Sequence, residues 1–201
     1  RKVFAESHLN PISYKGKEKK ISLAGFDRPF TPKNTNIPIY LGTVGPLMTK
    51  KCGEIAEGWI SHELCSPMYL ENNIIPKLTE GSTNDKIPKI VVSGLTVVDN
   101  DENNAKRIAA GTVAFYASVK TYDEFFTSHG FGTEAETIRK LFRERKISDM
   151  IDSVPDEMVD TFAIAGNKDF VKESIERYDG LADEIKLTPP THYVNEEQTR
   201  F

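Results

Sequence analysis

Cysteine is scarce in this chain of 201 residues, which has only Cys52 and Cys65. Two cysteines are too few for a disulfide framework, and we expect both to pack as small apolar residues in a reducing compartment. The sequence also lacks an apolar run near the roughly 20 residues that a membrane-spanning helix needs. Its first residues do not show a basic segment followed by an apolar one. We therefore predict a cytoplasmic protein without a membrane segment.

A surplus of positive charge is also lacking. The chain has 26 Lys and Arg against 30 Asp and Glu, for a net charge of −4, and its basic residues are scattered among acidic ones. This pattern argues against binding to a phosphate backbone, so we predict no nucleic-acid partner. His62 and Cys65 have a spacing found in metal sites, but no second pair follows at zinc spacing, and we predict no metal.

The composition of the chain, 38% hydrophobic and 28% charged, is typical of a globular protein. The chain has enough residues for a sizeable core. The chain begins at Arg1 rather than Met, inside a segment of helical character, RKVFAES. We therefore expect a piece of a longer protein. Prolines and glycines between residues 10 and 33 predict an extended excursion with one short hairpin.

Apolar runs typical of strands alternate with segments of helical period from residue 37 onward. The sequence predicts strands at 37–42, 59–64, 89–98 and 183–189 and, between the first three, helices at 47–58 and 68–81. Gly58 is expected to stop the first of these helices. Its predicted buried face consists of Leu47, Met48, Cys52, Ile55 and Ala56, continued by Trp59.

More helix lies between the last two strands than one crossover requires. We predict helices that follow the acidic segment 99–103, span 122–128, 134–152 and 155–166, and continue beyond an Asn167 N-cap. We treat the chain as a single domain, 1–201: a helix end and extended insertion (1–36), βα units (37–120), an inserted helical lobe (121–166), and a last helix, strand and tail (167–201).

Strands as apolar as these, alternating with helices, favour the α/β class with a parallel sheet. Four strands with their helices make half of an eight-stranded barrel, which typically takes about 250 residues. The fold class predicted is therefore α/β, the C-terminal portion of a (β/α)8 TIM barrel.

The turn Gly42-Thr43-Val44-Gly45-Pro46 joins the first predicted strand to its helix. Two glycines allow a tight turn and close approach of a ligand, and Pro46 suits the first helical position. Free amides at a helix start favour an anion such as phosphate. The turn is neither a Walker loop nor the three-glycine dinucleotide pattern. The other interpretation is a strand-to-helix turn whose glycines serve geometry alone.

Longer stretches resemble a known family. The segment IPIYLGTVGPLMTKKCGEIAEGWISHE resembles sequences of the luciferase-like monooxygenase superfamily, in which a Gly-rich turn, Gly-Pro and a helix of the type AGEIADGW recur. RKVFAESHLNPISYKGKEKKI, TVAFYASVKTYDEFFTSHGFG and DSVPDEMVDTFAIAGNKDFVKESIERY resemble deazaflavin-dependent members, in family order. The chain thus looks like the C-terminal part of such a barrel.

The resemblance implies an oxidoreductase that transfers hydride between the deazaflavin coenzyme F-420 and a small organic substrate. It implies that Gly42, Thr43, Val44, Gly45 and Pro46 hold the cofactor phosphate through backbone amides, with the Thr43 hydroxyl as an added donor. In such enzymes much of the catalytic apparatus lies on the first four strands, which have no counterpart here. We therefore assign no catalytic residue, and expect the isolated piece to be inactive and the full-length protein to be a homo-oligomer.

His62 and Glu63 follow the second predicted strand and are further candidates for contact with the cofactor or for proton donation; a hydrogen-bonded strand-end pair is the alternative. His129 could line a substrate pocket or cap a helix end. We expect Phe115, Tyr116, Phe125 and Phe126 in the core.

Three other functions stay open. An FMN-dependent monooxygenase is the nearest alternative and differs in the electron acceptor. A non-catalytic barrel fragment could act as an assembly partner. A sugar-phosphate isomerase or aldolase would share the barrel, but no Schiff-base or paired-acid signature is present.

Overall fold

The computed structural model describes residues 12–24, 33–83, 86–195 and 198. Its contacts divide the chain into two compact units, Arg1–Ile39 and Tyr40–Phe201, and each is described by itself. In the first unit, β1 (Ile12–Lys15) and β2 (Lys20–Leu23) pair antiparallel, which confirms the predicted hairpin. The helix expected at the start of the chain lies outside the described residues, and the assignment of one domain stays a prediction.

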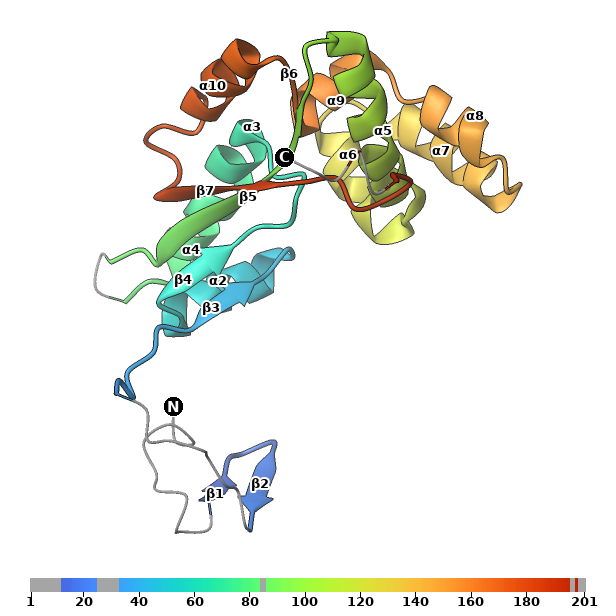
Figure 1. The fold of residues 1–201 in the computed structure, drawn as a ribbon. Coiled ribbons are helices and arrows are strands. Elements are labelled where there is room, and N and C mark those ends of the chain that lie inside the picture. The colour runs from blue at the N-terminus through green and yellow to red at the C-terminus, as the bar shows by residue number, and fades with distance from the viewer. Residues whose placement is uncertain (1–11, 25–32, 84–85, 196–197, 199–201) are drawn as a thin grey trace. The chain divides into compact units, whose positions relative to one another are not determined.

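A parallel sheet forms the centre of the second unit (Figure 1). Its strands are β3 (Tyr40–Gly42), β4 (Gly58–Ile60), β5 (Lys89–Val98), β6 (Ile164–Gly166) and β7 (Glu184–Thr188). The order is β3-β4-β5-β6, and β7 also pairs with β5. Every pairing is parallel, as the sequence predicts. Nearly all of β5 is buried, as expected for a strand covered on both faces.

The sequence predicts four strands here, and β6 is the one it misses. Its residues Ile164–Gly166 lie at the end of the helix predicted for 155–166. In the structure that helix, α9 (Asp156–Phe162), ends before Ala163, whose backbone is extended. The chain then pairs with Thr96–Val98 of β5. Pairing to β5 therefore overrides the local helical preference of the Ala-rich segment.

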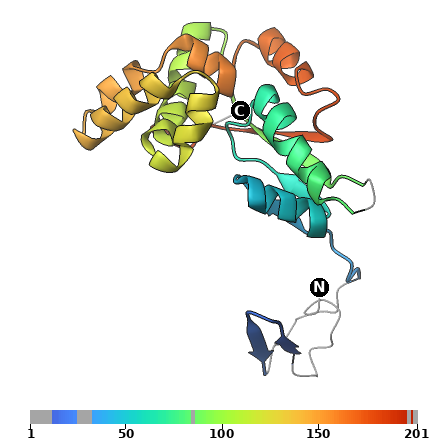
Figure 2. The ribbon, with the colours of Figure 1, turned by 180° about the vertical axis from the view of Figure 1, so that it is seen from behind.

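Helices α2 (Pro46–Ile55), α3 (Pro67–Tyr69) and α4 (Ile75–Gly81), with the π-helical turn η1 (Leu70–Ile74), lie on one face of β3 to β5 (Figure 2). Between them and the strands is a core that includes Cys52, Trp59 and Leu78. The backbones of α2 and α4 nearly touch. A Cβ on Gly53 would lie 2.2 Å from the Leu78 carbonyl oxygen, and one on Gly81 would lie 1.9 Å from that of Lys50.

The buried face of α2 differs from the predicted one. Thr49, Cys52 and Gly53 are buried, whereas Leu47 is 83% exposed. Met48 and Ile55 are exposed as well. Close packing on α4 explains the difference, because only small side chains fit between two backbones that approach so closely.

The ends of α2 and of a later helix also differ from expectation. Helix α2 ends at Ile55 with an extended Ala56, and Gly58 begins β4 instead of stopping the helix. The single helix predicted for 134–152 is broken into α7 (Gly132–Arg143) and α8 (Ile147–Asp152). Arg145 between them has a left-handed backbone with φ of 59°. This conformation is uncommon for arginine, so the sequence does not predict the break.

The other helices between β5 and β6 pack around α5 (Glu102–Ser118), whose N-cap Asp101 accepts hydrogen bonds from the amides of Asn103 and Asn104. After it come the 3-10 turn η2 (Lys120–Tyr122), α6 (Asp123–Ser128) and then α7 to α9. Phe126, Ile138 and Met158 form part of their shared core. Helix α10 (Lys168–Glu176) begins at Asn167, which caps it as predicted.

Both cysteines are buried and free, as expected. No helix within the described ranges has the length and apolar character needed to cross a bilayer.

Candidate functional site

A cavity of about 390 Å³ lies where β3 and β4 end. Its lining combines the end of β3 and the turn after it, the end of β4 and the residues after it, one residue each of β5 and α5, and two residues of β7. The lining residues are Gly42, Thr43, Val44, Ile60, Ser61, His62, Glu63, Ser93, Tyr116, Lys186 and Thr188. The carboxyl ends of parallel strands are where α/β sheets and barrels bind ligands, so this is the candidate site.

Five of the seven residues predicted to contact the cofactor line this cavity. They are Gly42, Thr43, Val44, His62 and Glu63. Gly45 and Pro46 do not line it; they begin α2 directly after the cavity-lining Val44. The sequence therefore places two separate segments at one site, although it does not predict that Lys186 and Thr188 of β7 join them. Their alternation on the last predicted strand was the available signal, because residues two apart face the same side.

The N-terminus of α2 has no side-chain cap. Gly45 is the N-cap, Pro46 occupies the first turn, and the first intrahelical bond runs from the Thr49 amide to the Gly45 carbonyl oxygen at 2.9 Å. The amides of Leu47 and Met48 precede that bond, and no side chain described in the structure caps them. An uncapped helix start of this kind presents N–H donors and a positive dipole end to an anion.

The backbone angles of the glycines in this turn do not support one of the two roles that the sequence suggests, the tight turn. Gly45 has φ of −76°, and neither Gly42 nor Gly45 is among the glycines with positive φ. A tight turn therefore does not explain them. What Gly45 provides is space, because a Cβ built there would meet no atom within 4 Å.

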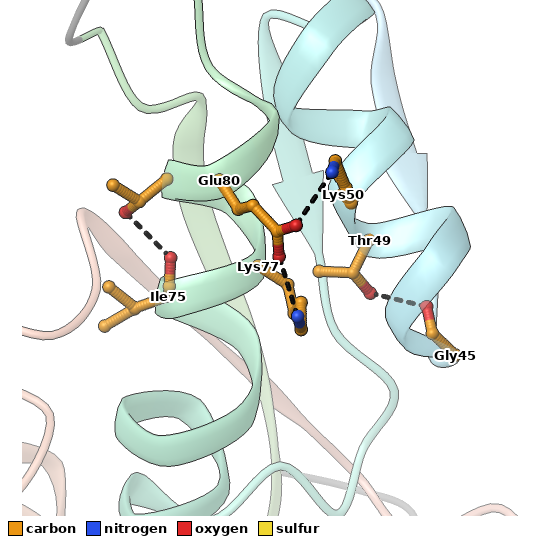
Figure 3. A network of polar contacts seen from close by, with 7 residues as sticks. Gly45, Thr49, Lys50, Ile75, Lys77 and Glu80 are labelled. Carbon is orange, nitrogen blue, oxygen red and sulfur yellow. Dashed lines mark hydrogen bonds and ion pairs between the residues drawn. The ribbon is translucent and has the colours of Figure 1, made fainter.

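Thr43 holds the turn in place. The indole Nε1 of Trp59 donates to both the carbonyl oxygen and the hydroxyl of Thr43, each at 3.0 Å. The Thr49 hydroxyl donates to the Gly45 carbonyl oxygen at 3.0 Å (Figure 3). Because the single Thr49 proton is used there, the 3.2 Å contact between the two threonine hydroxyls is a donation from Thr43. Contrary to expectation, the Thr43 hydroxyl thus has no proton left for a phosphate.

A charged cluster joins α2 to α4 on the surface. Glu80 lies between Lys50 and Lys77, with 2.7 Å from a carboxylate oxygen to each ammonium nitrogen (Figure 3). Hydrogen bonds from these two lysines lower the pKa of Glu80 to about 2. The cluster is exposed, so it adds little stability by itself. It nevertheless lies beside the contact between the two helix backbones.

His62 is neutral at physiological pH. Burial, and to a lesser extent the nearby His129, lowers the pKa of its imidazole to about 4. Its Nδ1 accepts a hydrogen bond from the Leu64 amide at 3.2 Å, so the ring proton is on Nε2. That Nε2 is buried and has no hydrogen-bond partner. The arrangement gives the site an N–H donor and not an acid.

Glu63 also has a buried oxygen, Oε2, without a partner. Burial raises the pKa of Glu63, while the positive charge of Lys186 lowers it in part. Burial and the charge of Glu63 raise the pKa of Tyr116 to about 12, so its hydroxyl stays protonated at neutral pH. The cavity thus combines N–H and O–H donors with one carboxyl group and one ammonium group.

His129 does not line this cavity; it ends α6. One ring nitrogen, Nδ1, lies 2.7 Å from the Phe125 carbonyl oxygen, and the other lies 2.7 Å from the Ser66 hydroxyl. Because a carbonyl only accepts, Nδ1 is the donor, and the helix-end interpretation is confirmed. Phe125 and Phe126 are buried as predicted, whereas Phe115 and Tyr116 are only partly so. No group of three or more His, Cys, Asp and Glu in the described part of the chain could hold a metal ion.

Comparison with known proteins identifies relatives that share this architecture. The chain is 32% identical over 171 residues to the 5,10-methylenetetrahydromethanopterin reductase of Methanopyrus kandleri, a match that covers 83% of the chain and 48% of that protein. The structure of the coenzyme F-420-dependent tetrahydromethanopterin reductase from Methanopyrus kandleri superposes with a TM-score of 0.75 and 26% identity, over 94% of this chain and 55% of that one.

A more distant structure, an F-420-dependent secondary alcohol dehydrogenase in complex with an F-420-acetone adduct, has a TM-score of 0.58 and 16% identity over 90% of this chain and 50% of that one, and shows the fold alone. The chain spans about half the length of the curated relatives it matches. The profile of the luciferase-like monooxygenase family matches residues 1–184. The chain therefore belongs to the luciferase-like monooxygenase family.

Proposed function

We propose that this chain forms the phosphate-binding part of an oxidoreductase that transfers hydride between coenzyme F-420 and a small organic substrate. The observation that carries the proposal is the uncapped start of α2 beside the cavity at the strand ends. When bound, the deazaflavin supplies the hydride chemistry, and the protein binds and orients it. We further propose a cytoplasmic location, a homo-oligomeric full-length protein, and the C-terminal portion of a TIM barrel as the architecture.

The residues at the turn fit a phosphate in three respects. The Leu47 and Met48 amides supply donors, the helix dipole favours an anion by about 0.3–1 kcal/mol, and the open space at Gly45 lets the anion approach the backbone. Trp59 fixes the turn through Thr43, so the donors are held in place before the ligand arrives. Beyond the turn, His62 and Glu63 line the same cavity, and each has a buried polar atom without a hydrogen-bond partner.

FMN is the second candidate cofactor, because it also carries a phosphate and the turn itself does not select between the two. The reductase structure that is 26% identical to this chain is named for coenzyme F-420, which favours the deazaflavin. A direct titration separates them. The chain is titrated with oxidised F-420 and, in parallel, with FMN, while the fluorescence of each cofactor is followed. We expect saturable quenching of F-420 at lower concentration than of FMN; binding of neither would contradict the proposal.

A matched pair of variants tests the phosphate position. In Gly45→Asp the new carboxylate caps the Leu47 and Met48 amides and occupies the anion position with a negative charge. Gly45→Asn caps them equally well without the charge. Both variants should fold, because the space at Gly45 is open. We expect Gly45→Asp to weaken F-420 binding by at least tenfold, and Gly45→Asn to weaken it less. Equal affinity in all three proteins would place the phosphate elsewhere.

A further inference from the structure

We propose that His62 is a substrate-binding residue, which donates its Nε2 hydrogen to an oxygen atom of an uncharged organic substrate in the cavity at the strand ends. This inference rests on the proposed oxidoreductase function and names the contact that the substrate makes there. It assigns to His62 a role in holding the substrate, separate from the phosphate position at the start of α2.

The hydrogen-bonding state of the ring comes first. The Leu64 amide donates to Nδ1 at 3.2 Å, which leaves the hydrogen on Nε2. That atom is buried without a partner, although His62 lines the cavity. A buried N–H that makes no hydrogen bond is unfavourable, because it has lost its water. A ligand oxygen that displaces the side chains covering this atom would satisfy it.

The surrounding charges favour an uncharged ligand. The titratable groups that interact with His62 or line the cavity with it are Glu63, Lys186, Tyr116, Tyr122 and His129. Burial keeps both histidines neutral at pH 7, since it lowers the pKa of each. Burial also raises the pKa of both tyrosines, which stay protonated. Glu63 and Lys186 have opposite charges. Because the charges around the cavity cancel, an uncharged ketone, aldehyde or alcohol oxygen is a more favourable ligand there than an anion.

An internal partner is the competing explanation for Nε2. The ring of His62 is edge-to-face with Phe125 at a centroid distance of 5.2 Å and with Tyr122 at 5.7 Å. An N–H directed at one of these ring faces would be weakly satisfied within the protein and would not need a ligand. The two explanations predict different responses to a small ketone.

The probe is cyclohexanone, added to the nitrogen-15-labelled chain with and without F-420. Nuclear magnetic resonance follows the Nε2–H signal of His62 and the amides of Ser61 and Ser93, which line the same cavity. We expect a saturable shift of all three. His62→Phe, which keeps an aromatic ring, should weaken cyclohexanone binding about tenfold, and His62→Gln, which keeps a donor near the Nε2 position, should stay within about threefold of the unchanged protein.

Two results would overturn the inference. One is an Nε2–H signal that shows the ring-current shift of an N–H over an aromatic face and does not respond to cyclohexanone. The other is equal cyclohexanone affinity in His62→Phe, His62→Gln and the unchanged chain, with thermal unfolding confirming that all three fold. The F-420 arm separates the two proposals. Failure of F-420 to bind while cyclohexanone shifts His62 would refute the cofactor and leave this contact standing.

Discussion

Replacing Gly53 with alanine should push α2 and α4 apart. The new Cβ would lie 2.2 Å from the Leu78 carbonyl oxygen, whereas ordinary van der Waals contact begins at 3.4 Å, so the backbones must separate by about 1 Å. Overpacking of this kind typically costs about 1–3 kcal/mol of stability. The cost should lie near the upper value here, because the new Cβ meets backbone atoms, which cannot move aside as a side chain can. Alanine regains about 1 kcal/mol of helix propensity. We expect a net loss of about 2 kcal/mol.

Thermal unfolding followed by circular dichroism measures this loss. For a chain of this size, 2 kcal/mol corresponds to a decrease in Tm of about 4–8 °C. Gly45→Ala is the matched control, because it is the same substitution in the same turn-and-helix segment, where a Cβ meets nothing within 4 Å. Because Gly45 is the N-cap of α2, where alanine is less favourable than glycine, this control should cost about 0.5–1 kcal/mol, or about 1–4 °C in Tm, which is less than Gly53→Ala. A Gly53→Ala protein as stable as the control would show that the two helix backbones do not pack as closely as described here.

Three further results are expected. Acid should destabilise the fold through His62, because folding lowers the pKa of its imidazole from 6.5 to about 4. The stability present above pH 6.5 is lost as the pH falls toward 4, by at most about 3 kcal/mol. Denaturant unfolding of His62→Phe should show a shallower loss of stability over the same pH range. Trp59→Phe should cost about 2 kcal/mol, since it removes the indole donor to Thr43; unchanged urea unfolding would refute the anchoring role. Asn167→Ala should cost about 1 kcal/mol by removing the α10 cap, and an unaltered midpoint would argue against that cap.

The sequence predicts best those elements whose local pattern agrees with their tertiary role. The long apolar run of β5 is typical of a covered parallel strand, and the acidic segment 99–103 and Asn167 predict the helices that follow them. The sequence does not predict those elements whose conformation depends on a single tertiary contact. The three residues of β6 are too short for a period, and Arg145 offers no glycine signal for its left-handed backbone.

In the candidate site, too, features with a local sequence pattern were predicted and features that depend on tertiary contacts were not. The turn after β3 and the pair His62 and Glu63 can be found from their places after predicted strands, and the structure brings both to one cavity. The role of Thr43 could not be found, because it depends on Trp59 reaching back across 16 positions to bind it. The exposed face of α2 was unpredictable for a related reason. Apolar periodicity does not reveal that Gly53 and Gly81 let two backbones meet.

The pairing of β5 has a consequence for how the sheet opens. Along its 10 residues β5 is hydrogen-bonded in turn to β4, β7 and β6, whereas β3 pairs through only three residues with β4. Amide hydrogens near the middle of β5 should therefore exchange with deuterium only when the whole unit unfolds, and those of β3 by local fraying. Since the proposed phosphate position follows β3, occupancy there would protect the part of the sheet that otherwise exchanges first.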